Sequence, residues 1–303
     1  MTISLPLPEQ VVLITGASTG IGAALAKVLA KRYPGIRLVL AARSREKLMT
    51  IAETCRLAGA EVAPVPTDFA QIEQAQALAR TALETFGRVD ILVNNAGYGQ
   101  MGPIELMPPA AVQNQFQVNL FGPLALTQAL IPALREQGGG RILNVSSLGG
   151  RIAFPFGGLY SGSKFALEAL SDALRMELEA FNIQVSVIEP GPVTTPFFQV
   201  VAEQIQQIIP HPFKTPYAAA FRNLETLEQQ TSSRAWTSEQ VAEVILQAIT
   251  DRTPRPRYVA ATQGDLMLFV MRKVLPTKVV DRFWQRFYAL DKVAQEWRTR
   301  SPN

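Results

Sequence analysis

Short apolar runs alternate with longer segments of helical periodicity from residue 11 to about residue 190. The apolar runs, which are candidate strands, lie at 11–15, 37–41, 61–65, 89–93, 141–145 and 184–189. The candidate helices between them lie at 20–33, 44–57, 71–86, 110–137 and 159–180. Repetition of strand and helix in this order predicts β–α units whose strands form one parallel sheet.

The candidate strands are apolar along nearly their whole length rather than at alternate positions. Such strands are buried on both faces, because helices cover both sides of a parallel sheet. Crossovers between parallel strands are almost always right-handed. We therefore expect a doubly wound α/β fold in a single domain.

The pattern changes after Glu189. The segment 196–236 contains four prolines and many apolar and aromatic residues, which predicts a helical lid over the carboxyl edge of the sheet. A helix at 238–250, capped by Thr237 or Ser238, and a strand at 257–259 would complete the sheet. We therefore divide the chain into a main domain, residues 1–260, and a C-terminal helical extension, residues 261–303.

Composition excludes several kinds of protein. The 303 residues include one cysteine, Cys55, and one histidine, His211, so an intrachain disulfide and a metal site built on cysteine or histidine clusters are excluded. The chain has no uncharged apolar run of 18 or more residues, and its first residues lack the regions of a signal peptide. We expect a cytoplasmic protein.

The first candidate strand leads directly into Thr15-Gly16-Ala17-Ser18-Thr19-Gly20-Ile21-Gly22 and then into a helix. Three glycines at this spacing allow a tight turn, close approach of the backbone to a pyrophosphate, and close packing of the helix on the strand. The helix N-terminus supplies free N–H groups and the positive end of its dipole. The turn predicts a dinucleotide site formed by Gly16, Ser18, Thr19, Gly20, Ile21 and Gly22.

The second candidate strand ends in Ala41-Ala42-Arg43-Ser44-Arg45. In dinucleotide-binding folds an acid near this strand end accepts from the 2′-hydroxyl of NAD. Arginine instead suits a 2′-phosphate, because a guanidinium donates two parallel hydrogen bonds to it. Arg43, with Ser44 beside it, therefore predicts NADP(H) in preference to NAD(H).

Tyr160 and Lys164 lie four residues apart in a candidate helix, so their side chains share a face. An ammonium near a phenol favours the phenolate and is expected to lower the pKa of Tyr160 toward working pH. Tyr160 is therefore a candidate general acid and base. Ser147 follows a candidate strand at its carboxyl end, where open α/β sheets bind ligands, and can hold a substrate oxygen.

Together these residues resemble the short-chain dehydrogenase/reductase family over about residues 9–196. The resemblance rests on the glycine turn, Asn94-Asn95-Ala96-Gly97, Asn119, Ser146-Ser147, Tyr160-Ser161-Gly162-Ser163-Lys164 and Pro190-Gly191-Pro192-Val193-Thr194-Thr195. The details resemble the branch that contains hydroxysteroid and retinol dehydrogenases and bacterial carbonyl reductases. The resemblance implies a Rossmann-type sheet and hydride transfer between a nicotinamide cofactor and a carbonyl or alcohol.

The resemblance also implies roles for individual residues. In reduction, Tyr160 would protonate the carbonyl oxygen, Lys164 would also bind the nicotinamide ribose, and Asn119 would hold a water in a proton relay. Asp68 would accept from the adenine amino group, and Thr195 would bond the carboxamide. The other cofactor contacts that it implies are Asn94, Ala96, Gly97, Pro190, Gly191 and Val193.

The residues expected around the substrate are apolar, and they favour a hydrophobic ketone, aldehyde or alcohol. They include Ile104, Leu148, Phe154, Phe156 and Phe197. A 3-oxoacyl thioester on an acidic carrier protein is an alternative, because its chain is also hydrophobic. A non-catalytic NADP(H)-sensing regulator or scaffold is another, although it predicts the loss of catalytic side chains that this chain retains. We also expect a homo-oligomer, either a dimer or a tetramer.

Charge is divided unevenly along the chain. Residues 252–303 hold eleven basic and four acidic residues, whereas residues 1–251 hold 18 basic and 21 acidic residues. No nucleic-acid-reading motif accompanies the basic tail, so we do not expect nucleic acid as a partner. The aromatic and basic residues of the tail recur at helical spacing. Such a helix packs on the lid or on another subunit, or it contacts an anionic membrane surface. We favour packing on protein over a membrane-peripheral role.

Overall fold

The computed structural model describes residues 5–195, 197–224 and 235–299. Its main sheet has seven parallel strands in the order β3-β2-β1-β4-β5-β6-β9. These strands are β1 (Val11–Thr15), β2 (Arg37–Ala42), β3 (Glu61–Pro66), β4 (Ile91–Asn94), β5 (Gly140–Val145), β6 (Ile183–Pro190) and β9 (Arg257–Ala260). The strand order reverses between β1 and β4, where the carboxyl ends of a doubly wound sheet form a ligand crevice. The predicted single-domain α/β fold is confirmed.

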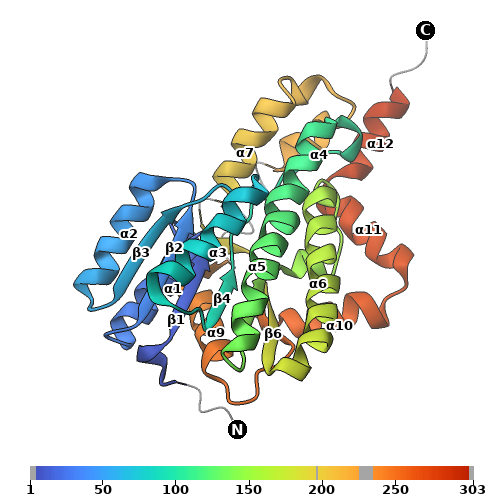
Figure 1. The fold of residues 1–303 in the computed structure, drawn as a ribbon. Coiled ribbons are helices and arrows are strands. Elements are labelled where there is room, and N and C mark those ends of the chain that lie inside the picture. The colour runs from blue at the N-terminus through green and yellow to red at the C-terminus, as the bar shows by residue number, and fades with distance from the viewer. Residues whose placement is uncertain (1–4, 196, 225–234, 300–303) are drawn as a thin grey trace.

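Helices cover both faces of this sheet (Figure 1). One core layer lies under α1 (Gly20–Arg32), α2 (Arg45–Leu57) and α9 (Ser238–Thr250), and the other lies under α3 (Ile72–Phe86), α5 (Gly122–Glu136) and α6 (Gly158–Leu178). In β1, Val12 and Ile14 belong to the first core layer, whereas Val11 and Leu13 belong to the second. Because successive side chains of a strand point to opposite faces, a continuous apolar run is needed here.

The strand β3 differs from the expectation that every strand is buried on both faces. Its end residues Glu61 and Pro66 are exposed, and the residues between them are only partly buried. The strand lies at the edge of the sheet and contains Pro64 and Pro66, which lack the N–H that a further strand would need. The edge position therefore explains both the prolines and the exposure.

The helix expected at 110–137 is not continuous. The structure has α4 (Pro109–Phe116), a π-helical turn at Gln117–Phe121, and then α5. Pro123 lacks an N–H and cannot donate to the carbonyl of Asn119, so the regular helical ladder cannot pass this point. The π-helical turn carries Asn119 in a buried position.

The lid begins with α7 (Phe197–Ile208) and continues into a short turn at Pro212–Lys214. Residues 196 and 225–234 of the predicted lid lie outside the described residues. An additional small sheet, not expected from the sequence, pairs β7 (Val193–Thr194) with β8 (Trp236–Thr237). Thr237 then caps α9 through a capping box with Gln240, as one of the two predicted caps.

The C-terminal extension contains α10 (Gly264–Phe269), a π-helical turn at Val270–Val274, α11 (Thr277–Phe287) and α12 (Leu290–Thr299). Trp284 and Tyr288 place their ring centroids 6.0 and 6.1 Å from that of Phe154. Phe156 joins this aromatic cluster, with its ring centroid 5.9 Å from that of Tyr288 and 5.6 Å from that of Phe221 in the lid. One face of the extension thus packs, partly buried, against the segment that precedes α6. Among the described residues, no helix combines the length and apolarity needed to cross a membrane.

Candidate active site

The glycine turn between β1 and α1 has a geometry that other residues would not fit. Gly16 and Gly20 have positive φ angles of 68° and 56°. A Cβ atom on Gly22 would lie 2.5 Å from the carbonyl oxygen of Gly16, closer than real Cβ contacts come. The backbone therefore turns tightly enough to leave the start of α1 open to a ligand.

The first turn of α1 has no side-chain cap. Its N-cap residue, Thr19, makes no side-chain hydrogen bond to the helix, in contrast to Thr237 at the start of α9. A cavity of about 340 Å³ opens here, and Ser18, Thr19, Gly20 and Thr195 are among its lining residues. A Cβ atom on Gly20 would lie 3.2 Å from Cγ2 of Thr195. The glycine turn, predicted to bind the pyrophosphate, thus lies beside the residue predicted to bond the carboxamide. Uncapped N–H groups beside a cavity fit a pyrophosphate.

Asn95, to which the sequence assigns no separate role, stabilises the glycine turn. Its side-chain amide donates to the carbonyl oxygen of Thr15 at 2.9 Å. The hydroxyl of Thr15 in turn accepts from the backbone N–H groups of Asn95 and Ala96, each at 2.9 Å. The end of β4 is thereby tied to the end of β1, and Ala96 and Gly97 are held beside the turn. The only sequence signal for this contact is a threonine at the end of one strand and an asparagine just after the end of another.

The side chain of Asn94 lies in the core rather than on the predicted adenosine side. Its amide donates to the hydroxyl of Thr127 and to the side-chain oxygen of Asn144, each at 2.9 Å. These bonds join β4 to α5 and β5. The side chain is buried, and its hydrogen bonds hold the sheet and α5 together.

The predicted adenosine-binding residues lie together where β2 and β3 end. Arg43 and Ser44 are exposed, and the Arg43 side chain has no hydrogen bond or ion pair within the described part of the chain. Asp68 is partly buried, and its carboxylate accepts from the N–H of Ala70 at 3.0 Å. These strand ends adjoin β1 and its glycine turn, because β2 pairs with both β1 and β3. A guanidinium that makes no hydrogen bond or ion pair with the described residues at this place fits a phosphate.

Lys164 lies near the predicted cofactor and proton-transfer residues. Its ammonium is buried, donates to the carbonyl oxygen of Val145 at 2.8 Å, and lies 5.9 Å from the ring centroid of Tyr160. A Cβ atom on Gly97 would lie 3.5 Å from the Lys164 nitrogen and 3.2 Å from the side-chain oxygen of Asn119. The structure therefore brings Gly97, Asn119, Tyr160 and Lys164 into one site.

Ser147 is placed against Tyr160 by a close turn of the backbone. A Cβ atom on Gly149 would lie 3.3 Å from the Tyr160 ring and 3.4 Å from the Ser147 hydroxyl. The Ser147 hydroxyl also accepts from the N–H of Gly149 at 3.0 Å and donates to the carbonyl oxygen of Pro190 at 3.5 Å. The neighbouring Ser146 is buried and points away from this site toward Glu168, as the contacts of Gly150 show.

The pKa of Tyr160 moves in the opposite direction from the one expected. Burial raises the pKa of Tyr160 above its usual value, and the hydrogen bond with Ser147 only opposes this shift. Burial also lowers the pKa of Lys164 to about 8, which the charge of Glu168 opposes. Desolvation of the Tyr160 phenol therefore outweighs its hydrogen bond with Ser147. A neutral phenol at pH 7 is the protonation state that a proton donor needs.

Asn119 holds the loop after β4 against α6. Its amide donates to the carbonyl oxygen of Tyr98 at 2.9 Å and to the hydroxyl of Ser163 at 3.1 Å, and its oxygen accepts from the N–H of Tyr98 at 3.0 Å. Ser163 in turn donates to the carbonyl oxygen of Tyr160 at 2.7 Å. The side chain therefore positions the loop. The water relay implied by the family resemblance stays a prediction.

Phe197, in the segment predicted to be a lid, packs against Tyr160. Its ring packs edge-on against Tyr160, and a Cβ atom on Gly99 would lie 2.5 Å from the same ring. The sequence places Phe197 among the apolar residues expected around the substrate. The ring gives the space above Tyr160 an apolar wall.

A family model described as short chain dehydrogenase matches residues 10–206. The chain belongs to the short-chain dehydrogenase family. Members of this family are oxidoreductases that bind nicotinamide cofactors and interconvert CH–OH and C=O groups on small substrates, and they commonly form oligomers. This short-chain dehydrogenase is therefore an oxidoreductase with a nicotinamide cofactor.

Known relatives cover most of the chain. Human 17-beta-hydroxysteroid dehydrogenase type 1 is 33% identical over 268 residues, which are 88% of this chain and 81% of the relative. A short-chain dehydrogenase/reductase from Burkholderia phymatum in complex with NAD is 28% identical with a TM-score of 0.77, covering 89% of this chain and 94% of that one. A metagenomic short-chain oxidoreductase in complex with NADP is 30% identical with a TM-score of 0.66, covering 83% and 96%.

Proposed function

We propose that this short-chain dehydrogenase uses NADP(H) to interconvert a hydrophobic ketone or aldehyde and the corresponding alcohol. The observation that carries the proposal is the meeting of Ser147, Tyr160 and Lys164 beside the uncapped start of α1. In this proposal Tyr160 donates the proton, Ser147 holds the substrate oxygen, and the start of α1 receives the cofactor. The name of the human relative, a hydroxysteroid dehydrogenase, supports a large apolar substrate.

The chain's own residues perform the proton transfer. The bound cofactor supplies the hydride in reduction and accepts it in oxidation. The Ser147 hydroxyl binds and orients the carbonyl oxygen near the Tyr160 phenol. Tyr160 then gives its proton to that oxygen, and the ammonium of Lys164 stabilises the negative charge left on the phenol. In oxidation the same proton returns to Tyr160.

Arg43 supports NADP(H) over NAD(H). Its exposed guanidinium lies at the end of β2 without a described protein partner, where it can bind a 2′-phosphate. The structural relatives include complexes with NAD and with NADP, so the family fold accommodates both cofactors. The choice therefore rests on the residue at this strand end.

The apolar walls of the site support a hydrophobic substrate. Phe197 closes the space above Tyr160, and Phe154 lies against Gly149, beside the two groups that bind and protonate the carbonyl. A ketone or aldehyde with an extended apolar body matches such walls.

We further propose that copies of the chain assemble through α6 and the neighbouring π-helical turn. Phe165 and Met176 are exposed on α6, and Phe121 is exposed at the end of the π-helical turn. Phe165 and Met176 are eleven residues apart, which places them on one face of the helix. Exposed apolar side chains that line up in this way are typical of subunit contacts. Size-exclusion chromatography with light scattering of the wild type and of Phe165→Glu tests this assembly.

The outer face of the extension fits an anionic membrane surface, which we propose as a peripheral contact. Trp284 and Tyr288 face inward, so packing on protein accounts for only one side of α11. Exposed apolar residues of this stretch are Leu266, Phe269, Val274, Val279 and Phe283. Exposed basic residues among them are Arg272, Lys273, Lys278, Arg282 and Arg286, against the exposed acids Asp265 and Asp281. Apolar side chains among basic ones favour an anionic lipid interface.

A substrate panel tests the proposed function. Purified protein is mixed with NADPH or NADH and with apolar ketones, apolar aldehydes, sugars and 3-oxoacyl thioesters, and cofactor absorbance is followed. We expect the highest kcat/KM with an apolar ketone or aldehyde and NADPH. Faster turnover of the thioesters would favour a 3-oxoacyl reductase instead, and cofactor binding without any turnover would favour a regulator.

A further inference from the structure

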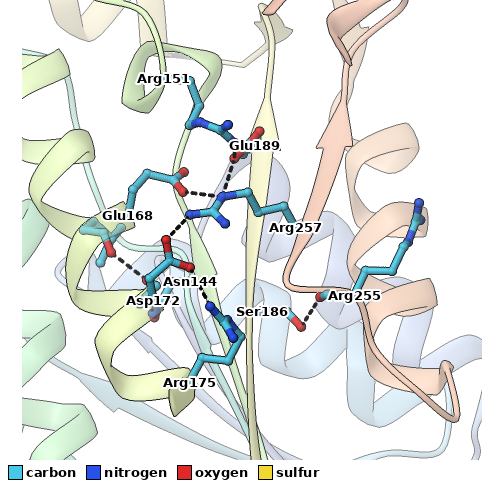
Figure 2. A network of polar contacts seen from close by, with 11 residues as sticks. Asn144, Arg151, Glu168, Asp172, Arg175, Ser186, Glu189, Arg255 and Arg257 are labelled. Carbon is cyan, nitrogen blue, oxygen red and sulfur yellow. Dashed lines mark hydrogen bonds and ion pairs between the residues drawn. The ribbon is translucent and has the colours of Figure 1, made fainter. Parts of the chain in front are cut away.

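A network of charged side chains joins α6 to the last two strands of the sheet (Figure 2). The guanidinium of Arg257 donates to the carboxylate of Glu168 at 3.1 Å and to that of Asp172 at 2.5 Å. It also lies 3.3 Å from the carboxylate of Glu189, which pairs with Arg151 at 2.7 Å. The network therefore connects the helix that carries Tyr160 to β6, β9 and the segment after Ser147.

The carboxylates of this network lie in the protein interior. Glu189 is fully buried and Glu168 is 5% exposed. Within the described part of the chain, Oε1 of Glu168 and Oε2 of Glu189 have no hydrogen-bond partner. Two buried carboxylates that share one guanidinium are costly for folding, because each charge loses its hydration. An ion pair at the surface would join the same elements without the loss of hydration. Stability of the fold therefore does not explain why a buried glutamate stands at position 168.

The position of Glu168 relative to Lys164 suggests what the carboxylate does. Glu168 follows Lys164 by four residues, so the two side chains lie one turn apart on the same face of α6. Lys164 is itself only 5% exposed, and the protein atom that its ammonium bonds is a neutral carbonyl. Burial favours the neutral amine, and the negative charge of Glu168 opposes that effect.

We propose that Glu168, held by Arg257, is a positioning residue that keeps Lys164 in its ammonium form while Tyr160 transfers the proton. The inference rests on the proposed roles of Tyr160 and Lys164. In this arrangement Arg257 keeps Glu168 ionised, and Glu168 in turn stabilises the ammonium. The ammonium of Lys164 thus depends, through Glu168, on Arg257 of β9, which is far from Tyr160 in the sequence.

The groups that face Glu168 come from several elements. On α6 the charged group is Lys164, on β6 it is Glu189 and on β9 it is Arg257. Asp172, Arg151 and Arg175 belong to the same network without contacting Glu168: Asp172 bonds Arg257, Arg151 bonds Glu189 and Arg175 bonds Asp172. Glu189 raises the pKa of Glu168, whereas Arg257 lowers it. Asp172 contacts the same guanidinium but lies about two turns from Lys164 along the helix, one turn beyond Glu168, and it is more exposed. Asp172 therefore offers a matched control, because its removal breaks a contact of Arg257 without removing the carboxylate beside Lys164.

The first readout is the titration of Lys164 itself, which does not depend on turnover. Protein labelled with ¹³C-lysine is titrated by NMR, and the Lys164 resonance is assigned by its loss in Lys164→Met. We expect Glu168→Gln to lower the pKa of Lys164 by about one unit, a tenfold loss of proton affinity that matches a close charge pair in the interior. Asp172→Asn should leave this pKa within a few tenths of the wild-type value. An unchanged pKa in Glu168→Gln, or an equal shift in both variants, would overturn the proposal.

The second readout is the pH profile of kcat for ketone reduction. In Glu168→Gln the alkaline limb should begin about one pH unit lower than in the wild type, and Glu168→Asp should restore part of the difference. Asp172→Asn should keep the wild-type profile. A shifted Lys164 titration with an unshifted rate profile would instead refute the role of the Lys164 ammonium in catalysis. If Glu168→Gln does not fold, Glu168→Ala, which also removes the carboxylate, carries both readouts, and a wild-type profile together with a wild-type titration in that variant would overturn the proposal.

Discussion

The ring of Phe197 packs edge-on against the ring of Tyr160, with the two centroids 5.6 Å apart. Phe197 belongs to the first turn of α7, so the segment predicted to be a lid contacts the proposed proton donor directly. The same ring fills the space over Gly99, where a Cβ atom would meet it at 2.5 Å. The size of this side chain therefore limits the substrates that can place a carbonyl against Tyr160.

Replacing Phe197 by alanine should widen the site. We expect kcat/KM for bulky ketones to rise relative to small ones by roughly fivefold, because a lost ring contact of this kind corresponds to about 1 kcal/mol. Phe213→Ala is the control, since Phe213 lies in the lid segment but is 51% exposed. An unchanged ratio of kcat/KM values in Phe197→Ala would show that this ring does not bound the substrate.

Tyr160→Phe should abolish turnover while cofactor binding persists. The variant removes the phenolic proton and leaves the glycine turn intact, and general acid catalysis contributes at least about 100-fold. Fluorescence titration with NADPH measures binding, and cofactor absorbance measures the rate. Retention of more than about a tenth of the wild-type rate would contradict the assignment of Tyr160 as proton donor.

Arg43→Asp should shift cofactor preference from NADP(H) toward NAD(H). The acid repels a 2′-phosphate and accepts from a ribose hydroxyl, whereas the guanidinium binds the phosphate. The measurement is the ratio of kcat/KM for the two cofactors, with Arg45→Asp as a neighbouring control on the same exposed segment. If only the control changes that ratio, Arg45 rather than Arg43 reads the 2′ position.

Much of this architecture could be predicted because the sheet places strong demands on the sequence. Every strand of its centre must be apolar on both faces, so β1 appears as an uninterrupted apolar run. The glycine turn is equally visible, since Gly22 cannot carry a side chain against the carbonyl of Gly16. Local patterns of this kind identify elements, and the shared carboxyl edge of parallel strands then places Ser147 near Tyr160.

Other features depend on contacts between distant residues and could not be predicted in this way. The pKa of Tyr160 depends on how deeply the phenol is buried, which spacing along a helix does not show. The buried network has only an indirect signal, a glutamate at the end of the apolar strand β6 and another one turn after Lys164. Its partner Arg257 lies 89 residues from Glu168 along the chain. The pairing becomes visible only when β9 takes its place beside β6.

Glu168→Gln should stabilise the protein above pH 6 although it impairs the site. Burial, followed by the charge of Glu189, raises the pKa of Glu168 from 4.5 to about 6 in the folded state. A carboxyl with a raised folded pKa binds more protons folded than unfolded between these values, so its cost grows as pH rises from 4.5 to 6 and is constant above 6. Glutamine removes that cost, which is about 2 kcal/mol. Urea unfolding of both proteins at several pH values measures the difference, which should shrink toward pH 4.5. A loss of stability at pH 7 would contradict this reasoning.

The last prediction concerns the outer face of the extension. Intact protein should bind vesicles that contain anionic phosphatidylserine and release from them as salt rises, because charge attraction is screened over about 8 Å at physiological ionic strength. Phe283→Ser and Arg282→Glu should each weaken this binding by roughly tenfold, since one loses an apolar contact and the other reverses a charge. Leu57→Ser is the matched control, because Leu57 is 82% exposed on α2 and lies outside the extension.

Sedimentation with vesicles measures the bound fraction. Negligible binding of the wild type, or equal binding by Phe283→Ser, would exclude this face as a membrane contact, and loss of a dimer in Phe283→Ser would assign it to a second copy of the chain.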